Sequence, residues 1–180
     1  DDGIGRVLRA VADAGLERNT LVIFTSDNGG IRYGRNWPFS FQKGSCWEGG
    51  IRVPAIVRWT GVVPPARETA QAAITMDWTA TILAVTGAKP NPSYPLDGED
   101  LLPVCTGDRP AYDRTLFFRN NSQEAVRVGK WKYLRELKNS QEHLFDLTAD
   151  PGEKNDLKER YPEIFSPLRA KYKDWNSRME

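Results

Sequence analysis

Residues 21–24 form an uninterrupted apolar run, and the turn sequence Asp27-Asn28-Gly29-Gly30 follows it almost at once. A short run of aliphatic and aromatic residues without polar alternation predicts a strand buried on both faces, as in a parallel sheet. Open α/β sheets bind their ligands just beyond the carboxyl ends of such strands. The run therefore predicts an α/β fold with a ligand site at the end of this strand.

The side chains of Asp27 and Asn28 suit a divalent cation. A carboxylate and an amide oxygen placed together are two hard ligands of the type that Ca²⁺ and Mg²⁺ prefer. The two glycines that follow allow a sharp turn and the close approach of a ligand. Asp-Asn-Gly is also a common turn sequence that only ends a strand, so both interpretations stay open at this point.

Lys43 is the third candidate site residue. An ammonium beside a cation held by oxygen ligands would bind a tetrahedral oxyanion such as sulfate or phosphate. Arg32 and Arg35 lie in the same glycine- and aromatic-rich loop and are rival anion ligands. Taken alone, a lysine in a loop is most often a solvated surface residue.

Helical and extended segments follow one another in two groups. In the first group, helical spacing predicts a helix over about 3–14 that stops at Gly15, and Asp77 and Gly87 are the expected N-cap and terminator of a second helix. The second group predicts a small antiparallel sheet covered by a terminal helix. Its strand candidates are 116–119, 125–128, 131–134 and 143–147, with a hairpin turn at 129–130 and the helix over about 162–177.

Composition excludes several classes of function. The formal net charge is +1, so no basic footprint indicates a nucleic-acid partner, and no apolar run is long enough to predict a transmembrane segment. Two cysteines are too few for a disulfide framework. Asn120-Asn121-Ser122 matches the pattern of a glycosylation acceptor. Because the chain opens directly into a helix without an initiator Met, we expect it to be a piece of a longer protein.

Two stretches around the candidate residues resemble the sulfatase family of the alkaline-phosphatase-like superfamily, including arylsulfatases and N-acetylgalactosamine-6-sulfatases. They are 25–29 (Thr-Ser-Asp-Asn-Gly) and 43–54 (Lys-Gly-Ser-Cys-Trp-Glu-Gly-Gly-Ile-Arg-Val-Pro), and the later stretches 76–83, 96–103, 125–132 and 144–157 agree in order. The resemblance covers essentially the whole chain. It implies the C-terminal part of the α/β sulfatase domain over 1–110 and a small antiparallel-sheet subdomain with a terminal helix over 111–180.

The resemblance also implies roles for single residues. Asp27 and Asn28 would bind Ca²⁺, with Mg²⁺ the less favoured ion. Lys43 would contact the sulfate and help to stabilise the leaving oxygen, as a substrate-binding and catalytic residue. Glu48 and Arg52 would shape the loop that positions this lysine, as a structural pair.

The nucleophile that the resemblance implies is not in this chain. Family members use a formylglycine made from the first residue of a Cys-x-Pro-x-Arg motif, and neither Cys46 nor Cys105 stands in such a motif. Asp1-Asp2 imitates the family's first-strand acidic pair but precedes a helix. His143 lies in a strand candidate and is interpreted as structural. We therefore expect the formylglycine in an upstream part of the same protein, which would be the partner of this chain, and expect the chain alone to be inactive.

The sequence thus predicts a Ca²⁺-dependent sulfatase that hydrolyses sulfate esters of small molecules or glycans. Most of the six tryptophans are expected in the core, but Trp37 and Trp47 lie near the candidate site and could pack on a sugar or aryl group. A phosphate-ester hydrolase of the same superfamily is one alternative, although its two-metal sites commonly need more histidines than this chain has. A non-catalytic binding module with the same fold is the other. The resemblance implies a periplasmic, secreted or lysosomal protein, and the sequence itself assigns no compartment.

Overall fold

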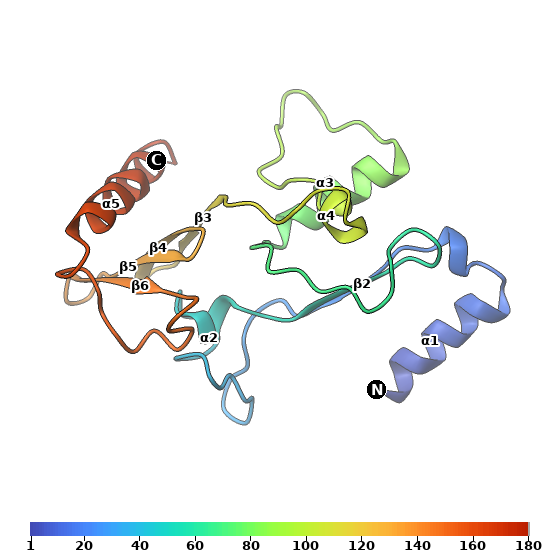
Figure 1. Cartoon of the computed structure of the whole chain (residues 1–180), viewed down its shortest axis with the longest axis horizontal. Coiled ribbons are helices and arrows are strands. Elements are labelled where there is room, and N and C mark those ends of the chain that lie inside the picture. The colour runs from blue at the N-terminus through green and yellow to red at the C-terminus, as the bar shows by residue number, and fades with distance from the viewer. Residues whose placement is uncertain (180) are drawn as a thin grey trace. The chain divides into compact units, whose positions relative to one another are not determined.

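The computed structural model describes residues 1–179, and its chain forms two compact units (Figure 1). The first unit consists of Asp1–Thr25 and Pro54–Ala111. The second consists of Ser26–Val53 and the chain from Tyr112 onward. The segment 26–53 therefore groups with the C-terminal part of the chain. The domains expected over 1–110 and 111–180 stay a prediction.

The first unit contains helices and a two-stranded sheet. In chain order its elements are α1 (Asp2–Asp13), a 3-10 helix (Glu17–Asn19), β1 (Val22–Thr25), β2 (Ala55–Arg58), α3 (Met76–Thr86) and α4 (Leu102–Thr106). α1 and α3 confirm the two predicted helices. Gly15 and Gly87 follow them with φ angles of 68° and 71°, a left-handed conformation that glycine adopts without strain.

The start of α3 differs from the prediction in one detail. The N-cap residue is Thr75, and Asp77 lies just inside the helix. The Asp77 carboxylate accepts one hydrogen bond from the backbone N–H of Ile74 (2.7 Å) and another from that of Glu99 (2.9 Å). Asp77 therefore satisfies a backbone donor at the helix start and also holds the crossing segment against α3.

β1 confirms the predicted strand, but its pairing is not the predicted one. It pairs with β2 in an antiparallel register, with Ile23 opposite Val57 and Phe24 opposite Ile56. One face is open in the described structure, since Phe24 is 46% and Ile56 60% exposed. The prediction of a parallel neighbour and of burial on both faces is wrong for these strands. An apolar run indicates that a segment is hydrophobic, but it does not predict whether the adjacent strand is parallel or antiparallel.

The second unit is built on an antiparallel sheet in the order β3-β4-β5-β6. Its elements are α2 (Glu48–Ile51), β3 (Thr115–Arg119), β4 (Gln123–Val128), β5 (Trp131–Glu136), β6 (Gln141–Asp146) and α5 (Pro162–Ser177). The predicted strands, the turn at Gly129 and the terminal helix are all confirmed.

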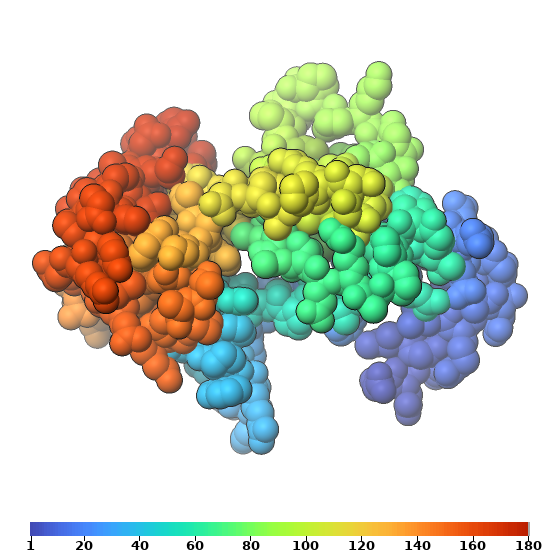
Figure 2. Space-filling model, viewed as in Figure 1, coloured from blue at the N-terminus to red at the C-terminus, as the bar shows by residue number. Residues whose placement is uncertain are grey.

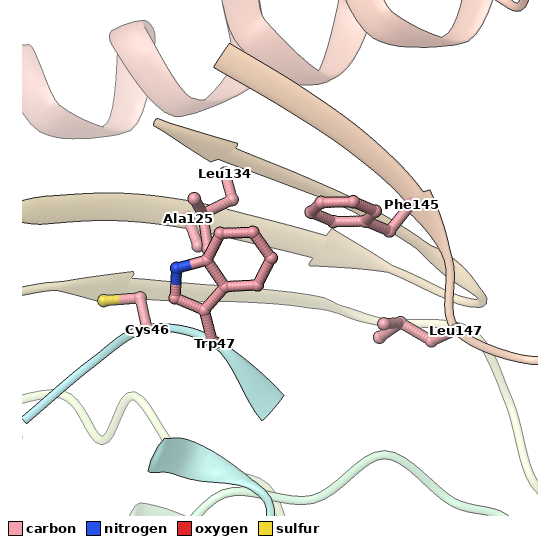
Figure 3. Close-up of a cluster of buried hydrophobic side chains, with 6 residues drawn as sticks. All are labelled: Cys46, Trp47, Ala125, Leu134, Phe145 and Leu147. Atoms are coloured by element: carbon pink, nitrogen blue, oxygen red, sulfur yellow. The ribbon is translucent and has the colours of Figure 1, made fainter. Parts of the chain in front are cut away.

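Both faces of this sheet are covered. Successive residues of a strand point to opposite faces, so each face carries its own set of apolar side chains. On one face Val126, Tyr133 and Leu144 pack against Leu168 and Tyr172 of α5. On the other face the cover comes from the segment that precedes α2. That second cluster consists of Cys46, Trp47, Ala125, Leu134, Phe145 and Leu147 (Figure 3). The sheet therefore fixes the position of the segment that leads away from Lys43.

The cysteines contribute no cross-link and no activated nucleophile. Cys46 and Cys105 are both free thiols. Burial raises the pKa of the Cys46 thiol to about 11, so this group is protonated at neutral pH. Among residues 1–179, no helix combines the length and the apolar character needed to cross a bilayer.

Candidate functional site

Asp27 and Asn28 lie in a bend directly after β1. The hydroxyl of Ser26 donates to the backbone carbonyl of Asn28 over 2.9 Å and tightens this bend. Asp27 is exposed and Asn28 is half-buried, so a ligand can reach the bend. That these two side chains bind a cation stays a prediction.

The glycine after Asn28 is required by close packing of two backbone segments. The N–H of Gly29 donates to the carbonyl of Gly50 over 2.9 Å. A Cβ added to Gly29 would collide with the carbonyl oxygen of Gly49, in helix α2. The bend that carries Asp27 and Asn28 is thus packed directly on α2, which fixes its distance from the segment that follows Lys43.

Hydrogen bonds bring the backbone of Lys43 beside this bend. The N–H of Lys43 donates to the carbonyl of Gly30 over 3.2 Å. The side chain of Asn36 closes the loop between them. Its Oδ1 accepts from the Gly30 N–H (2.8 Å), and its Nδ2 donates to the backbone carbonyls of Gly30 (2.9 Å) and Phe41 (3.0 Å). The structure therefore places the three predicted site residues on adjoining backbone segments. That their side chains share one ligand stays a prediction.

A buried ion cluster anchors α2 to the sheet. The ammonium of Lys132, on β5, lies 2.9 Å from a carboxylate oxygen of Glu48 and 2.7 Å from one of Glu153. The Lys132 side chain has no exposed surface. The other oxygen of Glu153 accepts from the backbone N–H of Glu48 over 2.6 Å. Burial raises the pKa of the Glu153 carboxyl, and the neighbouring Lys132 ammonium opposes that rise.

The predicted pairing of Glu48 with Arg52 is present but is the weaker contact. Arg52 lies 3.6 Å from Glu48 and its side chain is 44% exposed, whereas Lys132 is fully buried. Sequence reasoning missed Lys132 and Glu153. A lysine inside the otherwise apolar strand 131–134 was the available signal, because lysine is almost never fully buried unless it is paired.

The aromatic residues near the site divide into core and surface. Trp47 is 7% exposed and stacks on Phe41 with ring centroids 4.7 Å apart, so it belongs to the core. Trp37 is 87% and Tyr33 99% exposed, on a loop that projects from the second unit and is light blue in Figure 2. Of the two tryptophans considered as packing partners for a substrate, Trp37 is therefore the accessible one.

His143 has a structural partner, in agreement with its interpretation from the sequence. Its Nδ1 lies 3.0 Å from a carboxylate oxygen of Asp156, and its ring stacks on Phe145. Burial acts to raise the pKa of the Asp156 carboxyl. The hydrogen bonds from Lys158, Leu144 and His143 outweigh burial and lower this pKa below its ordinary value. Asp156 thus ties the chain after β6 back to the sheet.

Replacing Asp156 with Asn should lower the free energy of unfolding by about 1–2 kcal/mol at pH 7, because a charged acceptor is lost. A carboxyl whose pKa is lower in the folded state stabilises above its unfolded pKa, and this contribution disappears as the pH falls through the folded value. The difference between variant and parent should therefore shrink below about pH 4. Urea unfolding across this pH range measures it.

Asp174→Asn is the matched control for this prediction, because the Asp174 side chain is 71% exposed near the end of α5. It should change the free energy of unfolding by less than about 0.5 kcal/mol. A loss at Asp156→Asn that stayed constant down to about pH 3 would contradict the assigned role of the carboxylate.

The donors at the bend fit a hard divalent cation in kind. Asp27 supplies a carboxylate and Asn28 an amide oxygen, which are ligand types of Ca²⁺ and Mg²⁺. Within residues 1–179, no three His, Cys, Asp or Glu side chains gather into a metal-binding group. The two described donors can thus form one part of a coordination shell of about six to eight oxygens.

Comparisons with known proteins place these features in one family. The sulfatase family model matches residues 1–88. Steryl-sulfatase of Mus musculus is 33% identical over 216 residues, which cover 94% of this chain and 35% of that protein. N-acetylgalactosamine-6-sulfatase of Mus musculus is 37% identical over 139 residues, which cover 73% of this chain and 26% of that protein.

A solved structure agrees with these relatives. Ps i-CgsB in complex with k-i-k-neocarrahexaose matches with a TM-score of 0.86 and 27% identity, covering 97% of this chain and 40% of that chain. The chain belongs to the sulfatase family, and its fold is part of the alkaline-phosphatase-like α/β fold. It spans 35% and 26% of the length of the two curated relatives described above.

Proposed function

We propose that the protein containing this chain is a Ca²⁺-dependent sulfatase that hydrolyses sulfate esters of small molecules or glycans. One observation carries the proposal. The backbone hydrogen bond from Lys43 to Gly30 holds the predicted sulfate ligand beside the bend of the two predicted metal ligands. The names of the relatives, which include a steryl-sulfatase and an N-acetylgalactosamine-6-sulfatase, support both substrate classes.

The residues of this chain would act by binding and orienting the sulfate group. Asp27 and Asn28 would contribute two oxygen ligands to the cation. The cation, when bound, would neutralise negative charge on the sulfuryl oxygens. Lys43 would hold another sulfuryl oxygen through its ammonium and stabilise the charge that develops on the leaving oxygen.

The nucleophile of the proposed reaction comes from outside the 180 residues. Neither cysteine stands in a Cys-x-Pro-x-Arg motif, and Cys46 is buried in the core. We therefore propose that an upstream formylglycine supplies the attacking oxygen, and that this chain alone has no sulfatase activity.

Lys43→Ala in the complete protein is the direct test. It should lower kcat/KM for an aryl sulfate by about 100-fold, the effect of removing one charge-stabilising donor from an active site. Lys138→Ala, at an exposed turn residue, is the control and should stay within about twofold of the parent. Activity is measured in parallel on an aryl phosphate.

Three outcomes would refute the proposal. Unchanged sulfatase activity in Lys43→Ala would remove the role of the lysine. A parent protein that prefers the phosphate ester would favour the alternative hydrolase. A parent without activity on either ester, but with measurable affinity for sulfated glycans, would favour a binding module.

A further inference from the structure

The turn between β3 and β4 reaches the loop of Lys43 through one side chain. The side-chain oxygen Oδ1 of Asn120 accepts hydrogen bonds within its own turn, from the N–H groups of Ser122 and Gln123 (both 2.8 Å) and from the Ser122 hydroxyl (3.0 Å). Its amide nitrogen points to another segment. It donates to the backbone carbonyl of Gly44 over 3.1 Å and lies 3.5 Å from the sulfur of Cys46. Every polar atom of this side chain is thus engaged.

Lys43 is therefore held between two backbone anchors. The backbone N–H of Lys43 donates to the carbonyl of Gly30. The carbonyl of the next residue, Gly44, accepts from the side-chain amide of Asn120. Gly44 has a φ of 87°, so this point is a sharp turn that only glycine adopts easily. Because the Lys43 side chain is long and exposed, fixing its backbone on both sides reduces the space that its ammonium samples.

A second contact, from the first residue of β4, holds the same loop. The side-chain carbonyl of Gln123, at the start of β4, accepts from the buried N–H of Cys46 over 2.7 Å. Gln123 is itself held in the turn by Asn120. Asn120 and Gln123 thus hydrogen-bond to Gly44 and Cys46, the first and third residues after Lys43.

From these contacts we infer that Asn120 is a positioning residue for Lys43, acting through the carbonyl of Gly44. The inference rests on the proposed function, in which Lys43 contacts the sulfate. It also assigns a role to a residue that matches a glycosylation pattern. A glycan on the Asn120 amide would replace one of its two hydrogens and crowd Gly44 and Cys46, so we expect Asn120 to be unmodified in the folded protein.

The test separates the two functions of the Asn120 side chain. Asn120→Asp keeps an oxygen acceptor for the turn but removes the donor to Gly44. In the complete protein it should lower kcat/KM for a sulfate ester about tenfold, the size expected for one lost hydrogen bond in a positioned site. Asn121→Asp makes the same charge change on the adjacent exposed residue and should stay within about twofold of the parent.

A double-mutant cycle with Lys43→Ala separates positioning from general destabilisation. In the Lys43→Ala background, Asn120→Asp should change kcat/KM by less than about twofold, because the group that it positions is gone. An equal loss in both backgrounds would overturn the inference. A loss in Lys43→Ala alone, with Asn120→Asp active, would overturn it while sparing the proposed function. Full activity of Lys43→Ala would instead overturn the proposed function, and the role of Asn120 with it.

Folding is controlled with a second variant. Asn120→Ser keeps a short acceptor for the turn but cannot reach Gly44, and it replaces Asn120→Asp in the cycle if the latter does not fold. Mass spectrometry of the peptide that contains Asn120, from protein made in a glycosylating host, should show the unmodified mass. A glycan at Asn120 in active protein would overturn the inference.

Discussion

Replacing Lys132 with Met should lower the free energy of unfolding by about 3–5 kcal/mol, the cost of leaving buried charge without its partner. The Lys132 ammonium lies within 2.9 Å of Glu48 and 2.7 Å of Glu153, and neither carboxylate is more than 4% exposed. Methionine has a similar length and fills the same space, so the lost charge dominates the effect. Urea unfolding followed by tryptophan fluorescence measures the change.

Lys130→Met is the matched control for this prediction. Lys130 precedes the same strand and lies 2.6 Å from Asp146, but its side chain is 50% exposed. Asp146 is 11% exposed, but water screens the half-exposed Lys130 ammonium, so this variant should lose only about 1 kcal/mol, well below the loss at Lys132. Removing all three charges, with Lys132→Met, Glu48→Gln and Glu153→Gln, should recover part of the loss. A Lys132→Met protein as stable as the parent would show that the cluster does not hold α2 to the sheet.

Gly29→Ala should lower the free energy of unfolding by about 3 kcal/mol or more, because the new methyl group meets backbone that cannot move cheaply. The methyl group would overlap the carbonyl of Gly49, in helix α2. The bend must then move away from α2, and Asp27 and Asn28 move with it. Under the proposed function, the complete protein should lose sulfatase activity and Ca²⁺ affinity together, which activity assays and calorimetry with Ca²⁺ measure.

Gly3→Ala makes the same chemical change where the space is free. No atom lies within 4 Å of the position that a Cβ on Gly3 would occupy, and Gly3 is in helix α1. This control should leave activity unchanged and stabilise the helix by about 0.5–1 kcal/mol. A Gly29→Ala protein that kept full activity would contradict the close packing described for the bend.

Local periodicity was sufficient to predict most elements of the fold. α5 follows from Ile164, Leu168, Tyr172 and Trp175 on one helical face, and Leu168 and Tyr172 are indeed buried. Hairpin strands could be found because they are short, alternate in burial and are joined by turn residues such as Gly129. The direction of the neighbour of β1 could not be found, since β2 lies some thirty residues further on and strand composition does not specify its partner.

The sequence suggests a candidate site where its residues are adjacent, and its cation-binding role stays a prediction. Asp27 and Asn28 share one bend, and their chemistry is visible from their residue types. The contacts that fix the segments after Lys43 were not predictable, because they come from distant parts of the chain. Asn120 contacts Gly44, and Lys132 contacts Glu48, each across more than 75 residues. Such contacts depend on the register of the sheet, which no local pattern reveals.

Residues 46–47 pack on one face of the sheet, against strands β4, β5 and β6. This packing has a consequence for truncated proteins. A chain that stopped before β3 would keep Asp27, Asn28 and Lys43 but would lose the surface on which Cys46 and Trp47 pack. Those apolar side chains would face water, and Glu48 would lose its buried counterion. Premature termination before β3 should therefore yield an aggregating product, even though Asp27, Asn28 and Lys43 are still encoded.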